Sequence, residues 1–154
     1  MTEARPETPD ARRYLDDFQV GQRFTTGTHT MSEAEIIAFA QQFDPQPFHL
    51  DDTAARESVL GGLAASGWHT AAITMRLLVE GEMIAGGIVG AGGEITWPAP
   101  TRPGDVLHVD SEVLDVRPSR SRPDRGIVTI LSETKNQDGT VVQTFKAALV
   151  VPGR

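Results

Sequence analysis

The sequence predicts one α+β domain, in which a curved antiparallel β-sheet wraps around a long central helix. Helical patterns fall between residues 32 and 83, whereas alternating apolar and polar residues fill the chain after residue 86. Such segregation favours an antiparallel sheet with separate helices. The longest helical segment is apolar enough to be buried, and a curved sheet of about five strands would cover it. A chain of 154 residues is long enough for one domain with its own core.

The N-terminal part divides into a tail and an ordered entry. Residues 1–13 are rich in proline and charge, so we expect a disordered tail, and the domain itself should span residues 14–154. Residues 14–21 carry aromatic and apolar side chains that can pack on the body of the domain. The threonine-rich residues 22–31 are typical of a first strand.

A helix with a clear start and stop follows this strand. Ser32 and Glu35 have the spacing of a capping box, and apolar residues then recur at helical spacing up to Phe43. The helix should end there, because Asp44 precedes Pro45 and a residue before proline avoids the helical region.

Two further helices are expected before the sheet. A short helix follows residue 50, capped by Asp51 or Asp52. After the glycine-rich residues 60–67, a long helix should cover residues 67–83, with Arg76 and Glu80 spaced to pair. The apolar face expected for this helix consists of Ala71, Ala72, Met75, Leu78 and Val79, and Ile73 and Leu77 extend it nearly all round.

The remaining chain reads as a meander of strands. Alternating patterns occupy residues 86–100, 104–119, 125–139 and 140–151. The turn at Asp138 and Gly139 predicts a hairpin between the last two. A sheet of this kind leaves an edge strand that can pair with a second copy, so we expect a homodimer or a larger even-numbered homo-oligomer.

Composition excludes several classes of function. A net charge of −7 disfavours nucleic-acid binding as the main activity. The absence of cysteine excludes a disulfide framework, a thiolate zinc site and a cysteine nucleophile. No His and carboxylate group has metal-ligand spacing, so we expect no metal site. The chain has neither a secretory signal nor a run of roughly 20 apolar residues, so we expect a cytoplasmic protein that does not enter a membrane.

The stretch FDPQPFHLDD, residues 43–52, holds the first candidate for chemistry. Asp44 and His49 lie five residues apart, with two prolines stiffening the chain between them. An imidazole can take up and return a proton near neutral pH, and a neighbouring carboxylate can orient it. The alternative is a helix stop in which His49 only packs in a turn.

The start of the long helix holds the second candidate. Ser66 and Gly67 lie where free backbone N–H groups can bind developing negative charge, as in an oxyanion hole. The alternative is an ordinary helix cap in a tight turn. Trp68 either lines a pocket or packs. His29, His69 and His108 have no evident catalytic partner, and the arginines of residues 117–125 form either a phosphate-binding loop or a solvated turn.

Three stretches together resemble a known family. FAQQFDPQPFHLDDTAA, GGLAASGWHTAAI and ITWPAPTRPGDVLHVDSEV are similar to the MaoC-like dehydratases, the (R)-specific enoyl-CoA hydratase branch of the hot-dog fold. The resemblance covers roughly residues 14–151. The family motif has Asp, any residue, Asn, Pro, an apolar residue and His. Asp44 and His49 match this motif, whereas Gln46 replaces the usual Asn and Phe43 replaces a common Gly.

The resemblance implies an activity and roles for these residues. Asp44 and His49 would activate water for addition across, or removal from, the 2,3 double bond of an acyl-CoA thioester, and the Gly67 N–H would bind the thioester carbonyl. Coenzyme A would be part of the substrate, with no further cofactor. Some relatives carry a polar residue further along the central helix, where this chain offers Thr74 and Met75. A hot-dog thioesterase and a non-catalytic acyl-CoA-binding or partner subunit are the alternative hypotheses.

Overall fold

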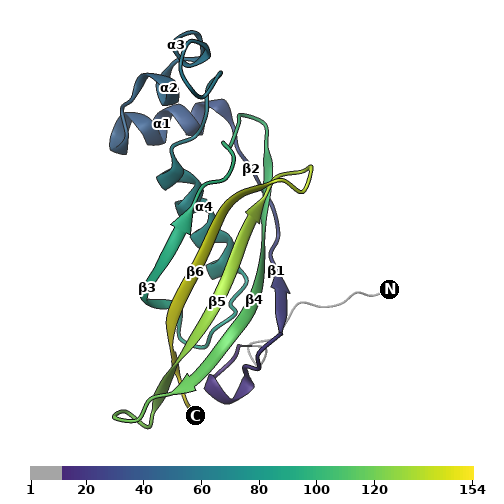
Figure 1. The fold of residues 1–154 in the computed structure, drawn as a ribbon, viewed down its shortest axis with the longest axis vertical. Coiled ribbons are helices and arrows are strands. Elements are labelled where there is room, and N and C mark those ends of the chain that lie inside the picture. Colours follow the sequence, from purple (N-terminus) through teal and green to yellow (C-terminus); the bar gives the residue numbers. More distant parts are fainter. Residues whose placement is uncertain (1–11) are drawn as a thin grey trace.

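An antiparallel sheet forms the body of the molecule in the computed structural model, which describes residues 12–154 (Figure 1). Its strands, within that range, are β1 (Arg23–Thr25), β2 (His29–Thr30), β3 (Val89–Thr96), β4 (Val106–Pro118), β5 (Arg125–Lys135) and β6 (Val141–Pro152). They lie in the order β1-β4-β5-β6-β3, and β2 also pairs with β4. All the pairs are antiparallel, and β4, β5 and β6 form the predicted meander. Strand β3 departs from it, because it pairs with β6 and not with β4, the next strand along the chain.

The long helix α4 (Gly67–Glu80) runs along one face of this sheet, nearest to β4 and β6 (Figure 1). Its buried Ile73, Leu77 and Leu78 join Val109 and Ile130 of the strands in one apolar core. Burying such side chains contributes roughly 1.5–3 kcal/mol each, which is the main force that holds the helix on the sheet. The predicted α+β class, with a sheet around one long helix, is confirmed.

The buried face of α4 differs from the predicted one. Its members are His69, Thr70, Ile73, Thr74, Leu77 and Leu78. Met75 and Val79, expected inside, are 37% and 52% exposed. The helix is apolar on nearly every side, so periodicity could not select a face, and the buried threonines are tolerated because each is hydrogen-bonded. The helix also ends at Glu80, three residues before the predicted end at residue 83. The expected pair is present, since Arg76 Nε donates to the Glu80 carboxylate at 3.0 Å.

Three shorter helices gather at one end of the sheet: α1 (Glu33–Phe43), α2 (Pro47–Leu50) and α3 (Asp52–Arg56) (Figure 1). The capping box of α1 is confirmed, since the Ser32 hydroxyl accepts from Glu35 N and the Glu35 carboxylate accepts from Ser32 N. Asp51 caps α3 by accepting from the N–H of residue 54. Helix α2 was not predicted. It begins with Pro47 at its first position, where the missing N–H and the fixed φ suit a helix.

The first predicted strand is interrupted. Residues 22–31 form β1 and β2 with a break at 26–28, so the prediction of one continuous strand is wrong. At the break, the Thr26 hydroxyl accepts from Val109 N at 2.9 Å, and this side-chain bond takes the place of a backbone ladder bond. The hairpin between β5 and β6 is confirmed. Its turn contains Gly139 at φ +79°, and the Asn136 side chain accepts from the N–H groups of residues 138 and 140.

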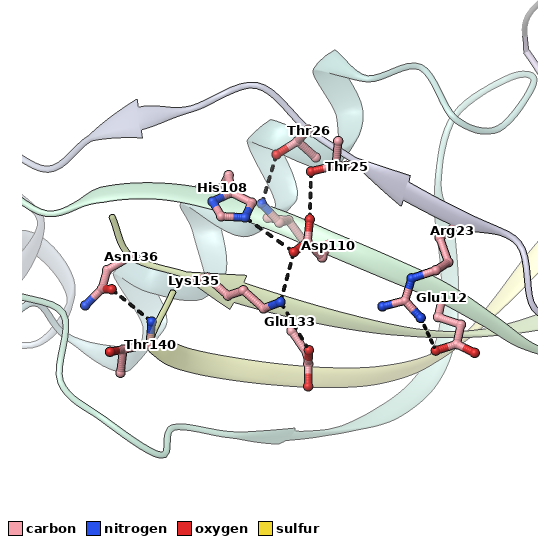
Figure 2. A network of polar contacts seen from close by, with 11 residues as sticks. Arg23, Thr25, Thr26, His108, Asp110, Glu112, Glu133, Lys135, Asn136 and Thr140 are labelled. Atoms are coloured by element: carbon pink, nitrogen blue, oxygen red, sulfur yellow. Dashed lines mark hydrogen bonds and ion pairs between the residues drawn. The ribbon is translucent and has the colours of Figure 1, made fainter. Parts of the chain in front are cut away.

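A polar network on the outer face of the sheet ties the short strand β1 to β4 and β5 (Figure 2). Asp110 accepts from the Thr25 hydroxyl at 2.7 Å and from Lys135 Nζ at 3.0 Å, and His108 Nε2 lies 3.4 Å from the same carboxylate. The Thr25 hydrogen bond and the Lys135 ammonium lower the pKa of Asp110 to about 2, although partial burial opposes them. His108 therefore has a structural partner that its sequence context did not reveal.

The N-terminal tail expected over residues 1–13 lies almost wholly outside the described residues. At its end, Arg13 N donates to the Met83 carbonyl, and Leu15 and Phe18 of the following segment are buried as predicted. Across residues 12–154, no helix combines the length and the apolar character that crossing a bilayer requires.

Candidate active site

A cleft of about 340 Å³ lies where the helical end of the domain meets the start of α4. Asp44, His49, Gly67 and Trp68, all predicted as site residues, line it. They come from the end of α1, from α2 and from the first turn of α4. The fold therefore brings the two predicted candidates, residues 43–52 and the helix start, to one cavity.

His49 is held in a defined orientation. Its side chain is buried, and Nδ1 lies 2.7 Å from the Ala64 carbonyl oxygen. Because a carbonyl can only accept, Nδ1 must carry the hydrogen. The neutral imidazole therefore has its lone pair on Nε2, which lies 3.3 Å from Asp44 Oδ2.

Asp44 follows the last residue of α1 and is held by two donors. Its Oδ2 accepts from the Ser66 hydroxyl at 2.7 Å, and its Oδ1 accepts from Gln46 Nε2 at 2.5 Å. Burial raises the pKa of Asp44, but the hydrogen bonds from Ser66 and Gln46 and the charge that His49 carries when protonated outweigh it, so the pKa lies below its ordinary value of 3.8. Asp44 is therefore ionised at neutral pH. The amide of Gln46, the residue that departs from the family motif, reaches the carboxylate.

Ser66 and Gly67 divide the tasks expected of them. The Ser66 side chain caps α4, because its oxygen accepts from Trp68 N at 3.2 Å while its hydrogen goes to Asp44. The helix cap expected as one alternative is therefore present, and the same hydroxyl also contacts Asp44. Gly67 is the first residue of the helix, and among residues 12–154 no acceptor takes its N–H.

The glycine at position 67 has a steric cause. A Cβ built there would lie 2.7 Å from Trp97 Cε2, closer than real side chains approach. The indole of Trp97 thus packs directly on the backbone beside the free N–H. Trp97 also lines the cleft and contacts Trp68 edge to face, with ring centroids 5.3 Å apart.

Sequence reasoning missed Ala64, Trp97 and Arg102, and it did not predict that Gln46 contacts Asp44. The Ala64 carbonyl and the Gln46 amide orient the Asp–His pair, and Trp97 forms a wall. Arg102 fixes the loop that supplies Ala64, donating to the carbonyls of residues 60, 62 and 63. The only sequence signal for these contacts was Gln46, which departs from the family motif. A backbone carbonyl and a tryptophan that lines a cleft have no recognisable sequence motif.

The arginine-rich residues 117–125 and the other three histidines do not line the cleft. The arginine-rich residues 117–125 join β4 to β5 at the opposite end of the sheet from α1–α3 (Figure 1). His29 Nε2 pairs with Glu35 at 2.8 Å, so this histidine too has a partner. His69 is buried against the ring of Phe39, and burial is the main influence that lowers its pKa. Within the described part of the chain, no three His or carboxylate side chains gather as a metal site would require.

Comparisons with known proteins identify the family and the fold. The model of the MaoC-like domain family matches residues 17–136. A MaoC-like dehydratase from Rhodospirillum rubrum has a crystal structure that is 61% identical, covers 92% of this chain and 98% of its own, and superposes with a TM-score of 0.91. R-hydratase PhaJ1 from Pseudomonas aeruginosa, at 24% identity over 92% of this chain and 86% of its own, shares the fold with a TM-score of 0.73. The architecture is the hot-dog fold, as predicted.

Two curated relatives extend this likeness. The uncharacterised protein YdeM of Bacillus subtilis is 39% identical over 140 residues, which cover 89% of this chain and 96% of that protein. A protein named 3-hydroxybutyryl-CoA dehydratase, from Methylorubrum extorquens, is 30% identical over 111 residues, covering 71% of this chain and 69% of its own.

Proposed function

Since the chain belongs to the MaoC-like dehydratase family, we propose that it is an acyl-CoA hydratase or dehydratase. It adds water across the 2,3 double bond of an enoyl thioester, or removes it in reverse. The curated relative named 3-hydroxybutyryl-CoA dehydratase supports a coenzyme A thioester as substrate. The residues that carry the reaction are Asp44, His49 and Gly67.

One geometric observation carries the proposal. The lone pair of His49 Nε2 and Asp44 Oδ2 face each other at 3.3 Å beside the cleft. When His49 is neutral, both atoms are acceptors, and a water molecule, which has two hydrogens to donate, can bind beside them. The pair is therefore suited to hold one water with its oxygen lone pair directed away from them, ready to attack.

The hydration step uses these groups in order. His49 Nε2 takes a proton from water while the water oxygen bonds to C3 of the substrate. The π electrons move toward the thioester, giving an enolate oxygen. His49, now an imidazolium beside the ionised Asp44, returns the proton to C2, and the carbonyl re-forms. One water molecule is added with no change of redox state, so the reaction needs no redox cofactor.

Gly67 supports the enolate oxygen. The free N–H at the first position of a helix of 14 residues combines a hydrogen-bond donor with the positive end of the helix dipole. The negative charge on the thioester oxygen grows as C3 is attacked, so this contact strengthens in the transition state and accelerates the reaction. Ser66 contributes indirectly, because its hydroxyl ties Asp44 to the same helix start.

The assembly and location follow the same proposal. Strand β3 pairs only with β6 among the described strands and is exposed along most of its length. An open edge of this kind can pair with β3 of a second copy. We therefore propose a cytoplasmic homodimer, or a larger even-numbered homo-oligomer built from it. Light scattering coupled to gel filtration measures the mass, and a monomer at micromolar concentration would contradict the assembly.

The test of the activity is hydration of crotonyl-CoA by the purified protein, followed by loss of the enoyl thioester absorbance. Asp44→Asn and His49→Gln each keep the size of the side chain and should lower kcat by about 10²–10⁴-fold. The exposed Asp115→Asn, on the outer part of β4, is the matched control and should leave kcat unchanged. Wild-type rates in both site variants would refute the roles of Asp44 and His49.

The same experiment separates the alternatives. A thioesterase would release free coenzyme A, detected with a thiol reagent, without a 3-hydroxyacyl product. A non-catalytic acyl-CoA-binding subunit would bind crotonyl-CoA with no turnover and would tolerate His49→Gln. Two departures from the family pattern favour that alternative: Gln46, and the position in the central helix where this chain offers only Thr74 and Met75. The contact of Gln46 with Asp44 weakens the first.

A further inference from the structure

We propose that Gln143, buried in β6 behind the cleft, is a positioning residue that fixes the indole of Trp97 against Gly67. The inference rests on the proposed function only for its kinetic consequence. Its structural part concerns one hydrogen bond and the ring that this bond holds.

Gln143 is in an unusual place for its chemistry. The residue is 1% exposed, in the interior of a strand beneath the central helix. A buried amide is costly unless both of its ends are hydrogen-bonded. Here, Trp97 Nε1–H donates to Gln143 Oε1 at 3.0 Å, and Gln143 Nε2 donates to Thr74 Oγ1 at 3.2 Å. Because an indole N–H can only donate, the amide has one allowed orientation.

The hydrogen bonds beyond Gln143 anchor it in the core. Thr74 is 1% exposed and lies in α4. Its oxygen accepts from Gln143, and its hydrogen goes to the Thr70 carbonyl at 2.9 Å, so the Thr134 hydroxyl, at 2.6 Å, must donate to it. The direction of each of these hydrogen bonds, from donor to acceptor, is therefore fixed. The network therefore ties Trp97, through Gln143 of β6, to Thr74 of α4.

The other end of the network is the wall of the site. Trp97 follows the last residue of β3 and precedes Pro98, so no ladder bond of a strand fixes it. The residue is 41% exposed, and its ring packs on Gly67 at a distance that leaves no room for a methyl group. The bond to Gln143 selects the rotation of the ring, and that rotation sets the space left beside the Gly67 N–H for a thioester.

Other buried polar groups do not account for this arrangement. Thr70 and Thr101 also line the cleft, but their hydroxyls bond to each other at 3.0 Å. Without Trp97, an apolar residue would serve at position 143, because Thr74 has a second donor in Thr134. The polar side chain of Gln143 is therefore explained by its contact with the indole.

The structural test uses the two tryptophans of the chain. Each gives one indole N–H signal in a ¹H–¹⁵N spectrum, and Trp68→Phe assigns them. Gln143→Met keeps the length of the side chain but removes both hydrogen bonds. It should shift the Trp97 signal and speed its exchange with solvent about fivefold or more, as expected for the loss of one hydrogen bond. Thr134→Val, the matched control in the same network, should leave the Trp97 signal in place. An unchanged Trp97 signal in Gln143→Met would overturn the proposal, whether or not the protein is an enzyme.

The kinetic test asks whether Gln143 acts through Trp97. Gln143→Met should lower kcat on crotonyl-CoA about fivefold or more with little change in KM, because the Gly67 contact strengthens in the transition state. In a Trp97→Phe background, where the indole N–H is gone, the same change should alter kcat less than twofold. Equal losses in both backgrounds would show that Gln143 does not act through Trp97. If Gln143→Met does not fold, Trp97→Phe breaks the same bond from the exposed end, and unchanged kcat in that variant overturns the proposal.

Discussion

Replacement of Gly67 by alanine adds one methyl group at the most crowded point of the site. The new Cβ would lie 2.7, 2.9 and 2.9 Å from three carbons of the Trp97 indole. Non-bonded carbons prefer about 3.5–4.0 Å, so the ring or the helix start must move by about 0.8 Å or more. Overpacking of this kind costs about 1–3 kcal/mol. In a helix freed of the clash, alanine would instead stabilise by up to ~1 kcal/mol relative to glycine.

The assay is a double-mutant cycle by urea denaturation, followed by circular dichroism at one protein concentration. Gly67→Ala should lower the free energy of unfolding by about 1–3 kcal/mol in the wild-type background and by nothing in a Trp97→Ala background. Gly27→Ala is the control, since a Cβ there meets no atom within 4 Å. An equal loss of stability from Gly67→Ala in both backgrounds would refute Trp97 as the reason for the glycine.

Three further predictions concern the groups around the pair and the outer face. Gln46→Leu removes a donor from Asp44, so the pKa of Asp44 should rise toward its ordinary value in a ¹³C carboxyl titration; an unmoved pKa would contradict the contact. Ser66→Ala removes both a helix cap and the bond to Asp44. It should lower the unfolding free energy by about 0.5–2 kcal/mol and also lower kcat, and a loss of stability alone would limit Ser66 to capping. Asp110→Asn should lower the unfolding free energy at pH 7 by about 1 kcal/mol. The difference between the folded pKa of about 2 and the ordinary value of 3.8 corresponds to ~2.4 kcal/mol, and solvent screening reduces this energy because the side chain is 28% exposed. Because the pKa of Asp110 is lower in the folded than in the unfolded protein, this stabilisation is present above pH 3.8 and is lost as the pH falls through about 2. Urea titrations measure the difference in unfolding free energy between the wild type and Asp110→Asn, and a difference that stays constant over this pH range would contradict the prediction.

The fold was predictable because local and global patterns agree along most of the chain. The capping box at Ser32, the proline after Asp44 and the hairpin turn at Gly139 each mark an element boundary that the structure keeps. Prediction was wrong where two arrangements satisfy the same pattern. The sequence of α4 is apolar nearly all round, so it does not indicate which face is buried. The threonine-rich residues 22–31 do not show that the side chain of Thr26 will replace a backbone hydrogen bond of the strand.

The site was predictable only where chemistry is local in sequence. Asp44 and His49 lie in one short stretch, and Gly67 marks a helix start, so the sequence offered all three as candidates, and the family resemblance favoured them over a helix stop and an ordinary cap. The groups that orient them come from elsewhere. The Ala64 carbonyl is a backbone group, and Gln143 meets Trp97 across 46 residues of chain, so no spacing rule could join them.

The most direct measurement of the central claim is the product formed from crotonyl-CoA and water, quantified by mass spectrometry for the wild type and for His49→Gln. The proposed function predicts 3-hydroxybutyryl-CoA from the wild type, and a rate lower by about 10²–10⁴-fold from the variant. A variant that forms this product at the wild-type rate, or a wild type that binds crotonyl-CoA without converting it, would contradict the assignment of His49 as the base.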